Sequence, residues 1–235
     1  GHRPAENTLS VTVSESLLPV LPEVLARIKN LFDLYCEPEA VYETLQVMNT
    51  LQPGLCVLGT RLPGCFNVFE MSVRAVLGQQ ITVKAASTLA ARLVAVYGTQ
   101  VQTGIEGLTH SFPAPAAILA LGENISEHLG KLGIISARAN TIYQLARVLA
   151  DEKNDFGFCG NPEEEMQKLQ AIRGIGSWTA QYIAMRAMGW PDAFLPTDAG
   201  IKKALPDHTP KELQVLSEAW RPWRSYATVN LWNTL

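Results

Sequence analysis

The sequence is short of cysteine and has no long apolar run. Its 235 residues include four cysteines, namely Cys36, Cys56, Cys65 and Cys159. They stand at unlike intervals, with no C-x-x-C pair and no histidine cluster, so they indicate ordinary thiols rather than a zinc site or a disulfide scaffold. No apolar run reaches the ~20 residues that a membrane-spanning helix needs. The first residues do not contain a basic stretch followed by an apolar one, so no secretory signal peptide is visible. We therefore expect a cytoplasmic protein.

The sequence also lacks the excess of positive charge that is usual in proteins that bind nucleic acid. Lys and Arg number 19 against 22 Asp and Glu, which gives a formal net charge of -3. The charges are unevenly spread, because from residue 166 onward eight Lys and Arg stand against five Asp and Glu, a local balance of +3. The last third of the chain can therefore present a basic surface to DNA although the whole protein is acidic.

Apolar residues recur at helical spacing along nearly the whole chain. The only clear period-2 alternation is TLSVTV at 8–13, which predicts one strand without a partner in the chain. A helix is expected over 17–34, and the next begins near Pro38. Two Pro-Gly pairs mark a break over 51–66. Further long helices are expected over 66–77, 83–97 and 136–149.

A tight turn between two expected helices is the first feature that indicates chemistry. Residues 166–172 and 177–188 have helical periodicity, and RGIG joins them. Gly174 and Gly176 are expected to adopt backbone conformations that other residues resist. The amides at the start of the second helix would then form a site where phosphate can bind. An ordinary corner between two helices, capped by glycine, is the alternative.

An aromatic pair and a single acid follow this turn. Trp178 and Tyr182 are four residues apart, so their rings share one face of the second helix. Asp198 in FLPTDAGIK precedes an expected helix that begins at Ala199. Taken alone, the aromatic pair is typical of a core. Asp198 taken alone is typical of a helix N-cap, where the helix dipole favours a carboxylate.

Several separated motifs together resemble one family. LQAIRGIGSWTAQYIAMRAMG followed by FLPTDAGIK is similar to the hairpin and Gly/Pro-Asp region of the helix-hairpin-helix DNA glycosylases, most of all the bacterial 3-methyladenine DNA glycosylase II (AlkA) type. The likeness extends through FDLYCEPEAV, LPGCFNVFEMSVRAVLGQQIT and WRPWRSYATVNLW, and so covers most of the chain. The resemblance implies a mainly α-helical fold with two helical subdomains. Residues 1–36 would be the remnant of an N-terminal α+β domain, 51–160 one helical subdomain, and 161–235 plus 37–50 the subdomain that bears the hairpin.

The resemblance also implies a role for each feature of the site. Asp198 would stabilise the positive charge that develops on the sugar as the N-glycosidic bond breaks. Trp178, Tyr182 and Trp232 would line a pocket for the base, which must leave the helix to be reached. An alkylated purine is cationic, and the faces of aromatic rings attract cations. The expected reaction is removal of alkylated purines of the 3-methyladenine type from duplex DNA by a monomer without a cofactor, at the nucleoid of a bacterium.

Two turns would hold the DNA. Gln80 in LGQQIT matches the place from which members of this family fill the gap that the flipped base leaves. The hairpin backbone would bind phosphate at Arg173, Gly174, Ile175, Gly176 and Ser177. Family members often hold a monovalent cation there, which in this chain would lie at the backbone carbonyls of Gln170, Ile172 and Ile175. No metal bound by side chains is expected.

Departures from the family pattern narrow the expected reaction. Trp178 occupies the position at which glycosylases that also cut the strand place a lysine, so no Schiff base can form there and the enzyme should be monofunctional. No cysteine follows Cys159, so the iron-sulfur cluster of the endonuclease-like branch is not expected. Thr197 and Ala199 replace an acid and an aromatic residue, which changes the edge of the pocket.

Two other classes of protein remain open from the sequence alone. A non-catalytic helix-hairpin-helix module that only holds DNA needs the hairpin glycines but neither Asp198 nor the aromatic residues. An unrelated helical enzyme would use Asp198 as a cap and the aromatic residues as core. Release of free base from methylated duplex DNA separates all three.

Overall fold

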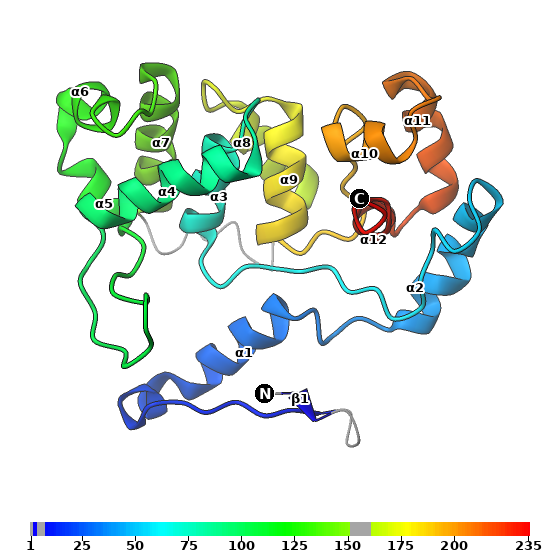
Figure 1. The fold of residues 1–235 in the computed structure, drawn as a ribbon, viewed down its shortest axis with the longest axis horizontal. Coiled ribbons are helices and arrows are strands. Elements are labelled where there is room, and N and C mark those ends of the chain that lie inside the picture. The colour runs from blue at the N-terminus through cyan, green and yellow to red at the C-terminus, as the bar shows by residue number, and fades with distance from the viewer. Residues whose placement is uncertain (1, 4–7, 151–160) are drawn as a thin grey trace.

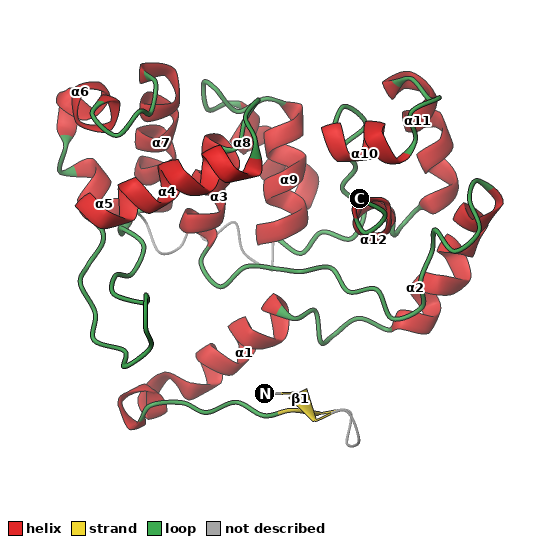
Figure 2. Ribbon diagram, viewed as in Figure 1, coloured by secondary structure: helices red, strands yellow, loops and turns green. Residues whose placement is uncertain are grey.

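The structure, a computed structural model, describes residues 2–3, 8–150 and 161–235. Helices make up most of this part of the chain, and Figure 2 shows one short sheet near the N-terminus. The mainly helical class predicted from the sequence is confirmed. The α-helices in chain order are α1 (Leu21–Leu31), α2 (Pro38–Leu45), α3 (Val68–Leu77), α4 (Val83–Tyr97), α5 (Pro115–Leu119), α6 (Ile125–Gly130), α7 (Ser136–Leu149), α8 (Pro162–Gln170), α9 (Ser177–Ala187), α10 (Ala199–Ala204), α11 (Pro210–Leu216) and α12 (Arg224–Trp232). None that the described residues form is both long and apolar enough to cross a membrane.

The predicted strand near the N-terminus is shorter than expected and has a partner. Strand β2 is Thr8–Leu9, and it pairs antiparallel with β1, His2–Arg3. The prediction that this strand lacks a partner in the chain is therefore wrong. A strand of two residues is too short to show alternation, so β1 leaves no period-2 signal in the sequence. Residues 10–13 lie outside the strand although their apolar and polar residues alternate.

The helix predicted over 17–34 is divided in two. A 3-10 helix, Glu15–Val20, comes first and contains Pro19. Helix α1 follows and has Pro22 in its first turn. Proline has no amide hydrogen, so it interrupts a continuous α-helix but fits the first turn, where the amides have no partner within the helix.

The later helices lie close to their predicted bounds. Both α4 and α7 begin and end where the sequence predicts. Helix α3 begins at Val68 because Asn67 is its N-cap, whose side chain accepts a hydrogen bond from the amide of Glu70 at 2.8 Å. The predicted break over 51–66 holds no helix, and a short 3-10 helix, Gln46–Thr50, ends just before it.

Two hydrophobic clusters meet at α9. The first is built by buried side chains of α3 to α9, and the second by those of α2 and α10 to α12 together with the segment that leads from α2 to α3. Ile183 of α9 belongs to the first cluster and Met185 to the second. In Figure 1, α3 to α7 lie on one side of α9 and α10 to α12 on the other, and the chain crosses between the two sides after α2. Helix α9 therefore joins the two halves, and its N-terminal end carries the hairpin.

Candidate functional site

Asp198 precedes the first residue of α10, and its carboxylate accepts four hydrogen bonds. Oδ1 accepts from the amides of Gly200 at 2.9 Å and Ile201 at 3.1 Å, which confirms the predicted helix cap. Oδ1 also accepts from the indole Nε1 of Trp232 at 2.9 Å. Oδ2 accepts from Nε1 of Trp178 at 3.1 Å. This set of donors suits an ionised carboxylate, which only accepts hydrogen bonds. The cap and the proposed reactive group are thus the same side chain.

Three aromatic side chains lie together beside this carboxylate. Trp178 and Tyr182 of α9 are stacked, with ring centroids 5.2 Å apart and an angle of 8° between the planes. The ring centroid of Trp232, at the end of α12, lies 6.3 Å from that of Tyr182, and the two ring planes make an angle of 50°. All three side chains are partly exposed. Because Trp178 and Tyr182 are already in contact, a flat ligand cannot enter between them and must stack on an outer face of the cluster.

Gly200 is a site residue that the sequence analysis did not identify. A Cβ at this position would lie 2.7 Å from Cδ1 and 2.9 Å from Nε1 of Trp232. Glycine therefore lets the indole lie against the first turn of α10 and reach Asp198. The sequence shows the glycine but not why it is required, because the indole that would meet a Cβ belongs to Trp232, 32 positions further along the chain.

The two glycines of the hairpin between α8 and α9 have different roles. Gly174 has a φ of +97°, and a Cβ there would lie 2.0 Å from Oγ1 of Thr141, so conformation and space both require glycine. Gly176 has a φ of -87° and a ψ of 179°, which any residue can adopt. The prediction that Gly176 needs an unusual backbone conformation is wrong. Apart from its two chain neighbours, no described residue has an atom within 4 Å of a Cβ added at Gly176, so its missing side chain leaves room for a group outside the protein.

The surface of the hairpin is formed mainly by its backbone. Gly176 is the N-cap of α9 and has no side chain with which to cap this end, so the first amides of the helix are available to an anion. Arg173 and Ser177 are exposed. Ile175 is only 4% exposed and belongs to the first hydrophobic cluster. Of the predicted DNA-binding residues, Ile175 can therefore contact a ligand only through its backbone.

Gly174→Ala should lower stability, whereas Gly176→Ala should weaken DNA binding. Gly174→Ala should destabilise the protein by ~1 to 3 kcal/mol, because alanine resists the positive φ and meets Thr141. Gly176→Ala should leave the melting temperature nearly unchanged but weaken binding of duplex DNA about tenfold, because the added methyl group occupies the space that a phosphate would approach. Thermal unfolding and fluorescence anisotropy with a labelled duplex measure the two effects. Parent-like DNA binding by Gly176→Ala would show that the hairpin does not contact DNA here.

Gln80 lies in the turn between α3 and α4, as predicted, and is exposed. Its φ is +53°, in the left-handed region that residues with a Cβ rarely adopt. Such a conformation persists only where the surrounding structure determines it. Residues next to Gln80 must therefore hold the turn through contacts with the rest of the protein. Local sequence patterns do not indicate these contacts.

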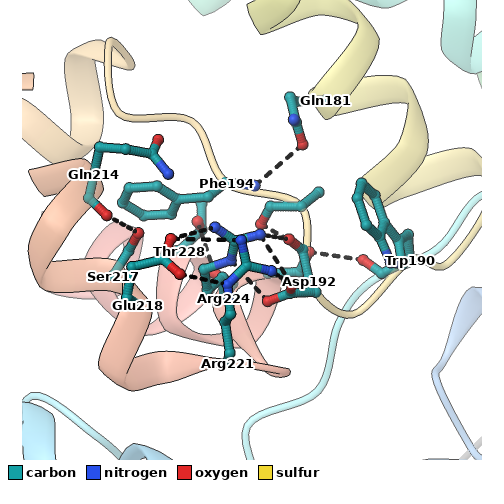
Figure 3. A network of polar contacts seen from close by, with 12 residues as sticks. Gln181, Trp190, Asp192, Phe194, Gln214, Ser217, Glu218, Arg221, Arg224 and Thr228 are labelled. Atoms are coloured by element: carbon teal, nitrogen blue, oxygen red, sulfur yellow. Dashed lines mark hydrogen bonds and ion pairs between the residues drawn. The ribbon is translucent and has the colours of Figure 1, made fainter. Parts of the chain in front are cut away.

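A buried ion pair ties the loop between α9 and α10 to the start of α12 (Figure 3). Arg224, 6% exposed, donates to both carboxylate oxygens of Asp192, at 2.7 and 2.9 Å, and to its main-chain oxygen at 2.8 Å. Arg221 also pairs with Asp192 and with Glu218. Asp198 follows the first of these segments and the indole of Trp232 lies at the end of the second, so the ion pair helps to set their relative position.

The three cysteines in the described part of the chain are free thiols. Burial raises the pKa of the Cys65 thiol to about 11. A thiol with such a pKa is almost entirely protonated near neutral pH and is a poor nucleophile. Cys159 lies outside the described residues. No group of three or more potential metal-ligating side chains occurs within 2–3, 8–150 and 161–235.

Comparison with known proteins relates the whole chain to DNA repair proteins. Residues 1–67 match the AlkA N-terminal domain, and residues 73–224 match the family described as "HhH-GPD superfamily base excision DNA repair protein". The chain is 38% identical over 230 residues to DNA-3-methyladenine glycosylase 2 of Escherichia coli, which covers 98% of this chain and 78% of that protein.

Two further comparisons concern length and fold. A probable bifunctional transcriptional activator/DNA repair enzyme AlkA of Mycobacterium tuberculosis is 40% identical over 216 residues, which cover 89% of this chain but 42% of that protein. Among solved structures, the 3-methyladenine DNA-glycosylase from Archaeoglobus fulgidus has a TM-score of 0.74 at 22% identity, covering 94% of this chain and 76% of that one. The helical fold expected from the resemblance is thereby confirmed.

Proposed function

The chain belongs to the HhH-GPD superfamily of base excision DNA repair proteins, and we propose that it removes alkylated purines such as 3-methyladenine from duplex DNA by hydrolysing the N-glycosidic bond. The observation that carries this proposal is the Asp198 carboxylate, which accepts one hydrogen bond each from the indoles of Trp178 and Trp232. A fixed anion suits the cationic sugar that forms, and aromatic faces suit a cationic base. The similarity to a DNA-3-methyladenine glycosylase over nearly the whole chain supports it.

The reaction needs little more than a fixed negative charge and a water molecule. When the C1′–N bond breaks, its electron pair goes to the alkylated purine, which leaves as a neutral base and needs no proton donor. The sugar becomes cationic, and Asp198 stabilises this charge. Water then adds to C1′ and releases a proton to Asp198 or to solvent. Oδ1 already accepts three hydrogen bonds and Oδ2 only one, so Oδ2 is the oxygen with room to face the sugar.

The hydrogen bonds around the carboxylate matter for the rate. Two backbone amides of α10 and two indoles of α9 and α12 hold Asp198 in one orientation. A group that is already oriented need not reorganise when the charge develops, which is where most electrostatic catalysis arises. The indoles thus have two roles in this proposal, because their N–H groups orient the acid and their ring faces contact the base.

DNA would lie across the face that carries the hairpin and the Gln80 turn. The hairpin residues Arg173 to Ser177 would bind backbone phosphate, and Gln80 would enter the gap that the flipped base leaves. A monovalent cation at the carbonyls of Gln170, Ile172 and Ile175 would add positive charge there. The DNA cleft would separate subdomain 51–160 from the subdomain formed by 161–235 and 37–50. The protein would act as a monomer on the bacterial nucleoid.

The enzyme would be monofunctional. Trp178 stands where glycosylases that cut the strand carry a lysine, and its indole nitrogen donates to Asp198. An indole N–H is not a nucleophile and cannot form a Schiff base with the sugar. The product would be an abasic site in an intact strand.

Incubation with methylated duplex DNA tests the proposed function. Free 3-methyladenine in the supernatant and an intact, alkali-sensitive strand are expected, and both can be measured by chromatography and gel electrophoresis. DNA binding without base release would instead indicate a helix-hairpin-helix binding module. Neither binding nor release would indicate an unrelated helical enzyme.

Gln80→Ala should slow base release from duplex DNA by roughly 10- to 100-fold, because the unstacked state loses the side chain that fills its gap. Release from single-stranded DNA should change much less, since there is no stack to open. Single-turnover rates on the two substrates measure the difference. Equal losses on both would show that Gln80 does not fill the gap.

A further inference from the structure

The side chain of Gln79 links the turn between α3 and α4 to the hairpin. Its Nε2 donates to the carbonyl oxygen of Gly174 at 2.9 Å and to Oγ1 of Thr179 at 2.9 Å. Gly174 lies in the hairpin turn and Thr179 in the first turn of α9. An amide nitrogen carries two hydrogens, so both are used in contacts with the hairpin. The neighbouring Gln80 side chain is exposed.

Helix α7 completes a ring of hydrogen bonds around this contact. Arg138 in its first turn donates from its guanidinium group to the main-chain oxygen of Gln79. Thr141, nearly one turn later, places Oγ1 2.9 Å from the main-chain oxygen of Arg173 and 3.0 Å from that of Ala137. Helix α7 therefore contacts both the turn and the hairpin, and Gln79 joins these two directly.

This ring explains how the strained turn is held. The left-handed conformation of Gln80, at a φ of +53°, is unfavourable for a residue with a Cβ. On the N-terminal side of Gln80, hydrogen bonds hold both the side chain and the main-chain oxygen of Gln79. On the other side Thr82 caps α4 by accepting a hydrogen bond from the amide of Ala85 at 3.2 Å. The exposed side chain of Gln80 is thus carried by a short segment that is anchored at both ends.

We propose that Gln79 is a positioning residue, which couples the phosphate-binding hairpin to the turn that presents Gln80 to the base stack. The inference rests on the proposed function and adds a residue that touches neither the base nor a phosphate. When the hairpin binds the backbone of DNA, the link places Gln80 at a set position relative to that phosphate. Binding energy gained at the hairpin then assists unstacking of the base. Without the link, the two contacts form independently.

Gln79→Met tests the coupling, because methionine has a similar length but no N–H to donate. Single-turnover base release from duplex DNA should fall about tenfold, whereas release from single-stranded DNA should stay within about twofold of the parent rate. Gln52→Met, the same exchange at an exposed loop position, should change neither rate. Equal losses on duplex and single strand would mean a merely structural role and would overturn the proposal.

A double variant separates coupling from an independent effect. If Gln79 acts through Gln80, then Gln79→Met combined with Gln80→Ala should release base from duplex no more slowly than Gln80→Ala alone. Losses that multiply would mean that the two residues act independently, which contradicts the proposal. Melting temperatures of all variants establish that each is folded at the assay temperature.

A measurement without catalysis distinguishes this inference from the proposed function. A duplex with 2-aminopurine opposite a stable abasic analogue becomes more fluorescent when a side chain enters the gap and unstacks the probe. The rise at saturating parent protein should be largely lost with Gln79→Met. An unchanged rise would overturn the role of Gln79. Absence of base release by the parent would refute the proposed function. The difference in fluorescence between the parent and Gln79→Met would still test the role of Gln79.

Discussion

Asp198→Asn should slow single-turnover release of 3-methyladenine from duplex DNA by about 100-fold or more while duplex binding persists, because the anion that stabilises the cationic sugar is lost. The carbonyl oxygen of asparagine can keep the position of Oδ1 and its hydrogen bonds with Gly200, Ile201 and Trp232. The amide nitrogen then replaces Oδ2 and faces the N–H of Trp178, so that one hydrogen bond is lost. Loss of a single hydrogen bond costs about 1 kcal/mol of stability, which a folded variant tolerates.

The control for this variant is Asp207→Asn, which removes the same charge from an exposed residue close by in the chain. It should release base at the parent rate. If Asp198 is only a cap, asparagine replaces it well, and Asp198→Asn would also work at nearly the parent rate. That result, in a variant whose melting temperature shows it to be folded, would contradict the proposed role of Asp198.

Arg224→Met should lower the free energy of unfolding by about 3 to 5 kcal/mol, because it leaves the carboxylate of Asp192 buried without its main partner. Asp192 is 7% exposed. Urea denaturation measures the loss. Arg221→Met is the matched control, since the side chain of Arg221 is 47% exposed and exposed ion pairs contribute about 0 to 1 kcal/mol. Parent-like stability of Arg224→Met would show that the ion pair does not hold this loop.

A second change in the same pair distinguishes a lost attraction from an unpaired buried charge. Combining Arg224→Met with Asp192→Leu removes both charges, and buried ion pairs can often be replaced by apolar side chains without net loss. The double variant should therefore regain part of the stability that Arg224→Met loses. A double variant that is less stable than Arg224→Met would mean that the hydrogen bonds of Asp192 matter more than its charge.

The sequence predicted those features that local chemistry determines. Helices α4 and α7 have their predicted bounds, since helical periodicity is a local signal. The cap at Asp198 and the contact of Trp178 with Tyr182 follow from spacing along a helix. These features depend only on residues close together in the sequence, so the sequence alone is sufficient to predict them.

Other features depend on contacts between distant residues. Gln79 reaches Gly174 across 95 positions, and Asp192 meets Arg224 across 32. Neither pair has a local sequence pattern, because a hydrogen bond between distant residues places no constraint on the residues between them. The two hairpin glycines look alike in the sequence, yet only Gly174 has a positive φ. Strand β1 is too short to leave a periodic signal.

The central claim is that the Asp198 carboxylate stabilises a cationic sugar, and affinity for a charged analogue of that sugar tests it most directly. The measurement compares binding of two duplexes, one with a protonated pyrrolidine in place of the sugar and one with a neutral tetrahydrofuran. The parent protein should prefer the cationic analogue by about 100-fold or more, and Asp198→Asn should lose most of this preference. Equal preference in the parent and in folded Asp198→Asn would contradict the account.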